Sequence, residues 1–502
     1  MTWTELHAAL RGAGLPVDEG VGADGSACVT GLTCDSRAVE AGSVFVAVKG
    51  LHADGNQFVA QAIARGAAAI VSDQPAPPDV GVPWTVVKDA RLALALLADA
   101  FHHHPSGEMR VVGITGTNGK TTTAYLIASI FEAAGVRCGL LGTVAYRVGH
   151  DVREASRTTP EAPELQRLLR DMVTEGCQAC AMEVSSHGLS LRRVDGMTFS
   201  AAVFTNLTRD HLDFHADMEA YFQAKRHLFD MLPRDAPALI NIDDPRGAAL
   251  AEMVAHPVTY AIHRPADITT GPLSFSLDGL DIDVRTPCGP LHVRSALIGR
   301  PNVYNILAAV SAATALEIPL KAIEDGIQSL NGVPGRFELV STAKDDVTVV
   351  VDYAHTDDAL RNLLETARPL VSGRLITVFG CGGNRDRTKR PLMGAVAGRL
   401  SELVVVTSDN PRGEDPVRIV EDVQRGLTAD LRRDSAPQVL TIVDRREAIG
   451  KAVELARHGD LVLVAGRGHE KYQVIGDRIV PFDDVVVARE ALARRRSSSG
   501  VA

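Results

Sequence analysis

A glycine-rich loop between an apolar run and a helical pattern carries the strongest chemical signal in this sequence. Residues 113–122 read Gly-Ile-Thr-Gly-Thr-Asn-Gly-Lys-Thr-Thr and follow Val111 and Val112. In this context, backbone N–H groups and a helix N-terminus attract phosphate, a lysine neutralises its charge, and a threonine hydroxyl can bind Mg²⁺. The match to the Walker A pattern is imperfect, because isoleucine occupies position 114 where that pattern has its first glycine. The loop still predicts a nucleotide site made by Gly116, Thr117, Asn118, Gly119, Lys120, Thr121 and Thr122.

Two further polar groups follow apolar runs at what should be the same edge of a sheet. Glu183 ends the run at 179–182, and His211 follows the run at 200–205. Because the carboxyl ends of parallel strands meet at one edge, both side chains should lie beside the phosphate loop. A carboxylate suits Mg²⁺, so Glu183 is a candidate metal ligand. The position of His211 at a strand end favours a functional role over a purely structural one.

The elements that must position these residues form three units along the chain. Its 502 residues exceed what one hydrophobic core usually serves. The first hundred residues read as a small α/β unit, with apolar runs at 43–48 and 68–71 around a helical pattern at 58–65. Polar, Pro- and Gly-containing stretches near 102–107 and 331–335 are typical of boundaries. We therefore predict domains at residues 1–105, 106–333 and 334–502.

The two larger units show alternating strand and helix patterns. In the second unit the alternation predicts a doubly wound, mostly parallel sheet, and the stretch 268–295 reads as an antiparallel appendage. In the third unit, each apolar run precedes a loop and a helical pattern, which is the spacing of a Rossmann-like domain. These runs are residues 348–351, 375–379, 403–407 and 461–465. The arginine-rich end at 494–499 is expected to fray.

Composition and charge narrow the class of function. Hydrophobic residues make up 45% and charged residues 23%, which is typical of a globular protein. A net charge of −10 argues against a nucleic-acid or membrane-surface role, so phosphate must be bound locally. The absence of a signal-peptide pattern and of an apolar run of about 20 residues predicts a cytoplasmic protein without membrane insertion. The seven cysteines fit reduced thiols, and the pair Cys177 and Cys180 is expected to pack in the core.

Five motifs in order make the sequence resemble the Mur ligases, and most closely their diaminopimelate-adding members. They are residues 116–122, Glu183-Val-Ser-Ser-His187, Thr205-Asn-Leu-Thr-Arg-Asp-His211, Asp352-Tyr-Ala-His355 and Gly466-Arg-Gly-His-Glu470. The resemblance runs from about Gly31 to about Gln473. It implies an ATP-dependent carbon–nitrogen ligase that adds meso-diaminopimelate to UDP-N-acetylmuramoyl-L-alanyl-D-glutamate through an acyl phosphate. That reaction belongs to cytoplasmic peptidoglycan precursor synthesis, with a uridine-binding first domain, a central ATPase domain and an amino-acid-binding third domain.

The resemblance also implies the catalytic centre. One Mg²⁺ ion is expected on Thr121 and Glu183, and a second on His211 and Lys225. A lysine ammonium would repel the metal, but the family carries a CO₂-derived carbamate on this lysine, which makes the side chain an anion. The remaining ATP contacts are Asn302, Arg336 and Asp352, with Arg336 reaching the γ-phosphate and Asp352 the ribose. The expected catalytic residues are thus Lys120, Glu183, His211, Lys225 and Arg336.

Two substrate sites follow from the same resemblance. The UDP-muramyl dipeptide is expected on Cys34, Ser36, His52, Ala53, Thr158, Thr159, Ser185, Leu191 and Arg193. Of these, Cys34 and Leu191 depart from the residue types usual in the family. Diaminopimelate is expected on Arg390, Asp409, Asn410, Pro411, Arg412, Gly466 and Glu470. The planar fork of Arg412 suits the carboxylate that lysine lacks, and Glu470 would take the distal ammonium.

Two alternative functions remain open. A folylpolyglutamate synthetase shares the phosphate loop and the lysine carbamate, but lacks the N-terminal uridine module and the Asp-Asn-Pro-Arg motif at 409–412. A noncatalytic P-loop module would bind ATP but would not need His211, Lys225 and Arg336 together. In each case the expected partners are small molecules, with no nucleic acid, and we expect a monomer.

Overall fold

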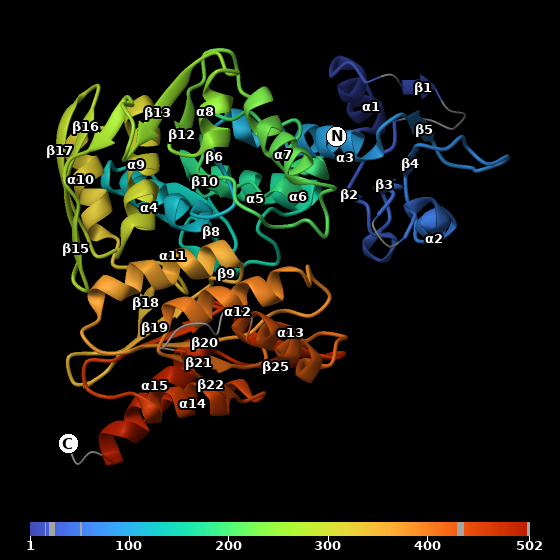
Figure 1. Cartoon of the computed structure of the whole chain (residues 1–502). Coiled ribbons are helices and arrows are strands. Elements are labelled where there is room, and N and C mark those ends of the chain that lie inside the picture. The colour runs from blue at the N-terminus through green and yellow to red at the C-terminus, as the bar shows by residue number, and fades with distance from the viewer. Residues whose placement is uncertain (16, 20–25, 51–52, 429–435, 499–502) are drawn as a thin grey trace.

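Three main sheets with their helices account for most of the chain. The computed structural model describes residues 1–15, 17–19, 26–50, 53–428 and 436–498. Figure 1 shows the N-terminal unit beside the central unit and the C-terminal unit, in orange and red, below it. The sheets use consecutive stretches, residues 17–87, 110–295 and 338–465. The predicted α/β class with parallel sheets is confirmed, and the division after residues 105 and 333 remains a prediction.

The N-terminal sheet has five strands in the order β1-β5-β4-β3-β2, parallel except where β1 meets β5. Strands β3 and β4 are buried at every position, and apolar side chains of α1 and α3 cover one face. The structure confirms, to within two residues, the strands predicted at 43–48 and 68–71 and the helix predicted at 58–65. The elements are α1 (Trp3–Gly12), β1 (Val17–Glu19), β2 (Gly31–Thr33), η1 (Ser36–Ala38), β3 (Ser43–Val46), η2 (Gly55–Phe58), α2 (Val59–Ala64), β4 (Ala69–Ser72), β5 (Trp84–Val87), α3 (Ala90–Phe101) and η3 (Pro105–Gly107).

The central sheet has twelve strands, and its middle is parallel. The order is β15-β16-β14-β13-β12-β11-β6-β10-β7-β8-β9, with β17 on β16. Strands β14 to β17 contain the predicted antiparallel appendage, although β14 itself runs parallel to β13. The strands are β6 (Arg110–Thr115), β7 (Cys138–Leu141), β8 (Ala145–Val148), β9 (Asp151–Glu154), β10 (Ala179–Glu183), β11 (Ala201–Phe204), β12 (Ala238–Asn241), β13 (Pro257–Ala261), β14 (Ile268–Thr270), β15 (Ser274–Ser276), β16 (Gly279–Thr286) and β17 (Gly289–Ser295).

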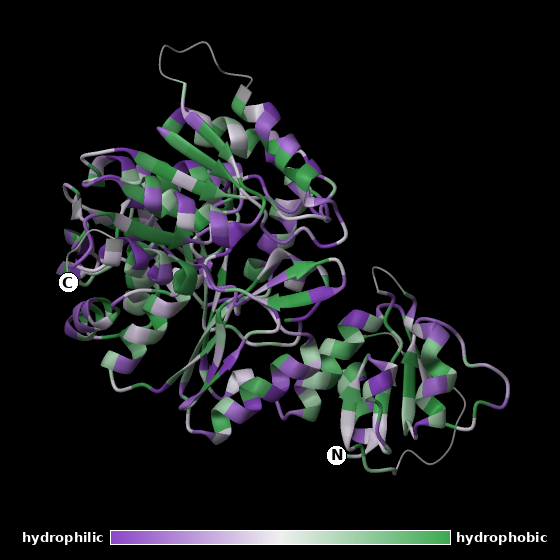
Figure 2. Ribbon diagram, turned by 90° about the horizontal axis from the view of Figure 1, so that it is seen from below, coloured by the Kyte–Doolittle hydropathy of each residue, from purple (hydrophilic) through white to green (hydrophobic). Residues whose placement is uncertain are grey.

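Helices cover both faces of this sheet because its strands are apolar on both sides. Val112 and Ile114 pack with α4, α9 and α10, whereas Val111 packs with α5 and α7. Figure 2 shows hydrophobic strands lying between helices whose outer faces are polar. This is the doubly wound arrangement that the sequence predicts. The helices are α4 (Lys120–Ala133), α5 (Ala162–Thr174), α6 (Ser186–Ser190), α7 (Met218–Asp230), α8 (Pro245–Ala251), α9 (Arg300–Ala315) and α10 (Leu320–Ser329).

The C-terminal sheet has the order β18-β19-β23-β20-β21-β22 and is parallel except for β18. Helices α11, α12 and α13 pack on one face, and α14 and α15 on the other. The elements are β18 (Glu338–Leu339), β19 (Thr348–Asp352), α11 (Asp357–Ala367), η4 (Arg368–Leu370), β20 (Leu375–Phe379), α12 (Lys389–Leu400), β21 (Leu403–Val406), α13 (Pro416–Thr428), β22 (Gln438–Thr441), α14 (Arg445–Leu455), β23 (Leu461–Ala465), β24 (Tyr472–Ile475), β25 (Arg478–Pro481) and α15 (Asp484–Ser498).

The end of the chain differs from the sequence-based expectation. Residues 494–498 continue helix α15, and only the last residues lie outside the described part of the chain. Arg495 donates to both carboxylate oxygens of Asp346 at 2.7 Å, and its Nη1 donates to the carbonyl of Ala456 at 2.8 Å. The expectation of a frayed tail was therefore wrong up to residue 498, because tertiary ion pairs hold this arginine. Among the described residues, each helix is too short or too polar to cross a bilayer.

Candidate active site

The phosphate loop lies at the point in the central sheet where the order in which the chain adds strands reverses. Strand β6 has β10 on one side and β11 on the other, both parallel to it. Glu183 pairs with Ile114 and Phe204 with Thr115, so the loops after all three strands leave the same edge. Open α/β sheets bind ligands at such a switch point. The loop that ends at Gly119 passes directly into α4, which begins at Lys120.

The loop after β11 holds the phosphate loop in place. The N–H of Asn118 donates to Asn206 Oδ1 at 2.9 Å, and the N–H of Thr117 donates to the Asn206 carbonyl at 2.9 Å. Thr205 Oγ1 donates to the Asn118 carbonyl at 2.6 Å. A Cβ at Gly116 would lie 1.9 Å from Thr205 Oγ1, so this close approach requires glycine there. The predicted nucleotide loop is thus preorganised by residues that lie almost ninety positions later.

Two lysines, Lys225 buried and Lys120 half-buried, converge on one carbonyl of this loop. Lys120 Nζ donates to the carbonyls of Gly116 and Thr117 at 2.9 and 2.8 Å, and Lys225 Nζ donates to the Gly116 carbonyl at 2.7 Å. Lys225 is 1% exposed and its Nζ lies 4.4 Å from the centre of the Tyr221 ring. Burial, together with the charge of Lys120, holds the pKa of Lys225 well below its usual range. Burial thus favours the neutral amine of Lys225 over its ammonium form.

Glu183 and His211 flank the same loop. Glu183 is 1% exposed, and its Oε1 and Oε2 accept the N–H and hydroxyl of Thr143 at 2.7 and 3.0 Å. His211 has a left-handed backbone, with φ of 54°. Its ring lies 6.0 Å from that of Tyr221, whose hydroxyl is 3.2 Å from Thr117 Oγ1. Burial lowers the pKa of His211 to about 3, so the imidazole is neutral and can act as a ligand.

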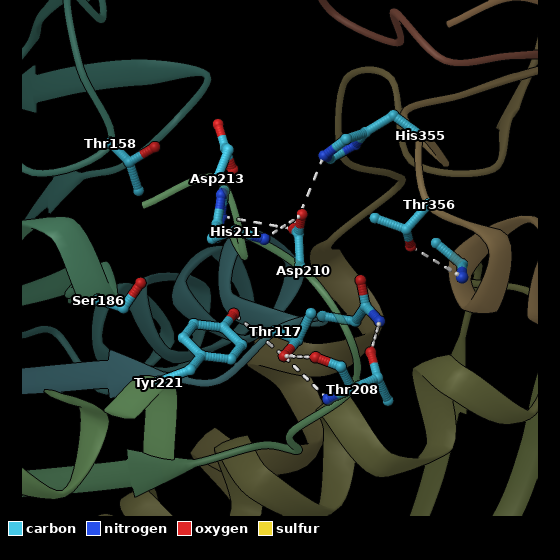
Figure 3. A network of polar contacts seen from close by, with 12 residues as sticks. Thr117, Thr158, Ser186, Thr208, Asp210, His211, Asp213, Tyr221, His355 and Thr356 are labelled. Carbon is cyan, nitrogen blue, oxygen red and sulfur yellow. Dashed lines mark hydrogen bonds and ion pairs between the residues drawn. The ribbon is translucent and has the colours of Figure 1, made fainter. Parts of the chain in front are cut away.

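Asp210 lies between the central and C-terminal units. Its Oδ2 is 3.4 Å from His211 Nε2 and 3.9 Å from His355 Nε2, as Figure 3 shows. Burial acts to raise the pKa of Asp210, but attraction to the protonated forms that His211 and His355 take in acid, the charge of Lys389 and the His211 N–H together lower it to about 2. The carboxylate is therefore charged at neutral pH. It adds a buried anion to the site that the sequence analysis did not assign.

The C-terminal unit reaches the phosphate loop through Arg336. Its Nη2 donates to Thr121 Oγ1 at 3.0 Å, and its guanidinium lies 4.6 Å from the centre of the Tyr353 ring. Asp352 accepts the N–H groups of Phe337 and Ala354 at 2.7 Å each. Asp352 thus fixes the backbone beside Arg336, and its expected ribose contact remains a proposal.

Asn302 approaches the loop through a second asparagine. It accepts Asn305 Nδ2–H at 2.9 Å and donates to the Ile298 carbonyl at 2.9 Å. A Cβ at Gly119 would lie 2.3 Å from Asn305 Oδ1, so Asn305 is the direct neighbour of the loop. Thr122 is buried in the first turn of α4. The sequence analysis named Asn302 but missed Asn305, one helical turn away on the same face.

The residues expected to bind the muramyl peptide form one network. Thr159 Oγ1 donates to the Glu183 carbonyl at 3.0 Å and is 3.1 Å from Ser185 Oγ. Arg193 donates to the Thr159 carbonyl at 2.9 Å. Thr158 Oγ1 lies 3.0 Å from Thr143 Oγ1, and Leu191 ends α6. Thr159, Ser185 and Arg193 are therefore linked to the backbone of the expected metal ligand Glu183, and Thr158 is linked through Thr143 to its carboxylate.

The expected uridine contacts lie in the N-terminal unit. Ser36 Oγ donates to Gln61 Oε1 at 2.9 Å, and the carbonyl of Ala53 accepts the Gly50 N–H at 2.8 Å. Burial and the nearby carboxylate of Glu161 raise the pKa of Cys34 to about 11, so its thiol is neutral. Glu161 belongs to the central unit, which places Cys34 at the junction of the two units. His52 lies outside the described residues.

Two loops of the C-terminal sheet meet at the switch point between β20 and β23. Asn410 Nδ2 donates to Glu470 Oε2 at 2.8 Å, and Arg467 Nη1 donates to Asn410 Oδ1 at 2.9 Å. A Cβ at Gly466 would lie 2.8 Å from Asp409 Oδ2. Pro411 continues this loop, and Arg412, at φ of 50°, donates to the Gly383 carbonyl at 3.0 Å. The residues that are predicted to bind the amino acid, apart from Arg390, thus lie together at one edge of the C-terminal sheet.

Arg390 is engaged within the protein. It is 1% exposed and pairs with Glu414 at 3.0 Å and with Asp422 at 2.9 Å. It also donates to the Gly382 carbonyl at 3.3 Å, next to the Gly383 carbonyl that Arg412 uses. Arg390 therefore lies beside the predicted site, but two carboxylates already neutralise its guanidinium. Its expected direct contact with the amino acid remains a proposal.

Contacts between the central and C-terminal units join the loop after β11 to the loop before α12. Arg209 pairs with Asp386 at 3.3 Å and contacts the Thr388 hydroxyl, and Asp213 pairs with Arg385 at 3.9 Å. The expected metal loop therefore faces the loop that leads to Arg390, one of the residues expected to bind the amino acid. Sequence reasoning missed these pairs because they join residues about 175 positions apart and have no local signature.

Comparisons with known proteins agree over nearly the whole chain. Three family models match: "Mur ligase family, catalytic domain" at residues 28–102, "Mur ligase middle domain" at 114–313 and "Mur ligase, glutamate ligase domain" at 335–468. The UDP-N-acetylmuramoyl-L-alanyl-D-glutamate–2,6-diaminopimelate ligase of Geobacter metallireducens is 47% identical over 493 residues, covering 94% of this chain and 95% of that protein. The ligase of the same name from Gloeobacter violaceus is 49% identical over 470 residues, with 93% and 95% covered. A solved structure of a ligase with this name superposes with a TM-score of 0.68 at 35% identity, covering 99% of both chains.

Proposed function

This chain belongs to the Mur ligase family, and we propose that it is an ATP-dependent ligase that adds meso-diaminopimelate to UDP-N-acetylmuramoyl-L-alanyl-D-glutamate. The similarity to relatives that are named as 2,6-diaminopimelate ligases extends over the N-terminal unit and over residues 409–412. Neither region would be needed for folylpolyglutamate synthesis or for noncatalytic binding of ATP. The relatives therefore favour this reaction over both alternatives.

The catalytic proposal rests on one observation. Charged groups from several segments converge on the phosphate loop. Lys120 and Lys225 share the Gly116 carbonyl, and Arg336 reaches Thr121 from the C-terminal unit. Carboxylates that can balance these cations, Glu183 and Asp210, lie at the same edge. Such a set of cations and anions suits the reaction of two anions, a substrate carboxylate and a triphosphate.

The donor set fits Mg²⁺ when nucleotide is also bound. Glu183 offers a buried carboxylate, Thr121 a hydroxyl and His211 a neutral imidazole. In the described part of the chain, His, Cys, Asp and Glu side chains form no ready cluster of three that would hold a metal alone. Phosphate oxygens and a modified Lys225 would therefore complete the two ion sites. When bound, the ions would screen the repulsion between carboxylate and triphosphate.

We propose that Lys225 reacts with CO₂. Its depressed pKa leaves neutral amine, which is the form that adds to CO₂ with formation of an N–C bond and loss of a proton. The product is an anion in place of a cation, and it would offset the charge of Lys120 beside it. Protein prepared in ¹³C-bicarbonate should show a carbamate carbon by NMR. The Lys225→Arg variant, which cannot form a stable carbamate here, should lack that signal, and its persistence would contradict the assignment.

The chain's own residues have three roles during the reaction. Lys120 and Arg336 stabilise charge on the transferring phosphoryl group while a carboxylate oxygen of the substrate attacks phosphorus and ADP leaves. Thr158, Ser185 and Arg193 position the muramyl peptide. The amine of the second substrate then displaces phosphate from the acyl phosphate. The C-terminal unit, held by Arg209 and Arg385, keeps water from hydrolysing that intermediate.

The C-terminal loops support diaminopimelate as the amine substrate. Arg412 offers a bidentate fork for the distal carboxylate, which lysine lacks, and Glu470 offers an acceptor for the distal ammonium. Burial, together with the neighbouring Asp409, raises the pKa of Glu470, so a cationic substrate would stabilise its charged form. These groups lie on one chain, which supports a monomer, and the nucleotide-linked substrate places the reaction in the cytoplasm.

Substrate-dependent phosphate release tests the proposed function. Phosphate should be released from ATP only when UDP-N-acetylmuramoyl-L-alanyl-D-glutamate and meso-diaminopimelate are both present. Lysine at the same concentration should support little release. Equal turnover with lysine would overturn the amino-acid assignment and leave the ligase assignment intact, whereas release without either substrate would argue for a simple ATPase.

A further inference from the structure

We propose that Thr143 is a positioning residue that orients the Glu183 carboxylate for metal binding and links it to the muramyl-peptide site. This inference rests on the proposed function, in which Glu183 ligates Mg²⁺. Thr143 follows strand β7, which pairs parallel to β10 with Leu141 opposite Met182. The residues after these two strands therefore leave the sheet together, and Thr143 comes beside Glu183.

Thr143 fixes both oxygens of the Glu183 carboxylate at once. Its backbone N–H donates to Oε1 at 2.7 Å, and its hydroxyl donates to Oε2 at 3.0 Å. Two donors from one residue prevent the carboxylate from rotating about its terminal bond. A Cβ at Gly142 would lie 2.3 Å from Glu183 Oε1, so the chain must pass this carboxylate at a distance that only glycine permits. The end of β7 is thus shaped around the carboxylate.

The direction of the hydrogen bonds extends this role to Thr158. The single proton of the Thr143 hydroxyl is donated to Glu183, which is an acceptor only. At the 3.0 Å contact with Thr158 Oγ1, Thr143 must therefore accept, and Thr158 must donate. Thr158 then has no hydroxyl proton left for the substrate. It presents lone pairs, so it binds an N–H or O–H donor of the muramyl peptide and not one of its carboxylates.

Thr143 also lies beside the C-terminal unit. Burial lowers the pKa of His469, which precedes Glu470 in the expected amino-acid site, to about 4, and the nearby Thr143 backbone acts in the opposite direction. His469 stacks on Tyr353 with ring centres 5.0 Å apart, and Tyr353 lies under the Arg336 guanidinium. Thr143 therefore contacts the expected metal ligand and the expected muramyl contact, and it lies beside the C-terminal unit. Such a position suits coupling between the substrate sites.

Metal binding by the nucleotide complex tests the proposal without relying on turnover. The affinity for Mn²⁺, a paramagnetic substitute for Mg²⁺, is measured by electron paramagnetic resonance in the presence of ADP. Removing an outer-shell partner typically weakens metal affinity by about 10- to 100-fold, and Thr143→Val should show a loss in this range. Thr143→Ser keeps the hydroxyl and should bind Mn²⁺ within about twofold of the natural protein.

A matched control separates this effect from the loss of any half-buried hydroxyl. Thr314 lies in the same unit, and its hydroxyl donates only to helix carbonyls at 2.7 and 3.2 Å. Thr314→Val should leave Mn²⁺ affinity unchanged. Wild-type affinity in Thr143→Val, or an equal loss in Thr143→Ser, would overturn the proposal. If Thr143→Val does not fold, the smaller Thr143→Ala removes the same hydroxyl and must show the same loss.

Discussion

Replacing Asn410 by leucine tests how the two loops of the expected amino-acid site are held together. Asn410 is 4% exposed and joins three partners. It donates to Glu470 Oε2 at 2.8 Å and accepts Arg467 Nη1–H at 2.9 Å and the Val474 N–H at 2.8 Å. Leucine has a similar volume but makes none of these bonds. The variant therefore removes the polar link and keeps most of the packing.

The geometry predicts where the released groups go. Arg467 Nη1 already lies 3.4 Å from Glu470 Oε2, so the two unpartnered charges should pair directly. Two charge-assisted bonds, each worth about 1.5–3 kcal/mol, are lost, and the closer ion pair recovers about one of them. The net loss of roughly 1.5–3 kcal/mol appears as weaker binding of diaminopimelate, because Glu470 then pairs with Arg467 and no longer accepts a hydrogen bond from the substrate ammonium. This corresponds to a roughly 12- to 160-fold rise in KM for diaminopimelate.

Steady-state kinetics with each substrate varied in turn is the assay. The KM for ATP should change less than about twofold, because the nucleotide loop lies in another unit. Gln424→Leu removes an amide of the same unit that donates to Thr441 Oγ1, away from the residues expected to bind the amino acid, and it should leave both constants unchanged. An equal rise in both KM values, or an unchanged KM for diaminopimelate, would refute the role given to Asn410.

Three further predictions concern single side chains. Arg412→Ala should raise KM for diaminopimelate by about 10- to 150-fold, the worth of one charged hydrogen-bonded contact; comparable losses for ATP would speak against a carboxylate fork. Lys225→Arg should lower kcat by at least about 100-fold and stay inactive in bicarbonate, while the natural protein freed of CO₂ should regain activity when bicarbonate returns; recovery of the variant would disprove the need for a carbamate. Burial lowers the pKa of His102 to about 4, below its ordinary value of about 6.5, so the folded state binds fewer protons than the unfolded state in this interval. Stability should therefore fall as the pH drops from 6.5 to 4, and His102→Gln should flatten that part of the Tm profile; identical slopes for both proteins would contradict it.

Local sequence patterns predicted the phosphate loop and the sheet edge around it. The loop at 116–122 has glycines, a lysine and a following helix in one continuous segment. The positions of Glu183 and His211 followed from strand periodicity, because parallel strands present their carboxyl ends together. The family resemblance supplied what periodicity could not, such as Lys225 on a helix. The structure brings these residues to one edge, as the sequence analysis expected.

Contacts between distant segments could not be read from the sequence. Asn305 and Thr143 lie in segments without a distinctive composition, and Asp210 lies in the 205–211 motif without a role that the motif itself indicates; their roles arise only when helices and strands pack against the loop. The buried pairing of Arg390 with Glu414 and Asp422 likewise depends on how α12 and α13 meet. The short hairpin of β8 and β9 was missed because β9 is exposed at all four positions and lacks an apolar face. In each case tertiary packing determines the contact, and local sequence propensity does not predict it.

Oxygen transfer from the substrate carboxylate to phosphate tests the central claim most directly. The γ-carboxylate of the D-glutamyl residue is labelled with ¹⁸O, and the inorganic phosphate formed with ATP and diaminopimelate is examined by mass spectrometry. The proposed acyl phosphate requires that each phosphate released carry one oxygen from that carboxylate. Phosphate without the label, formed together with the amide product, would contradict the mechanism.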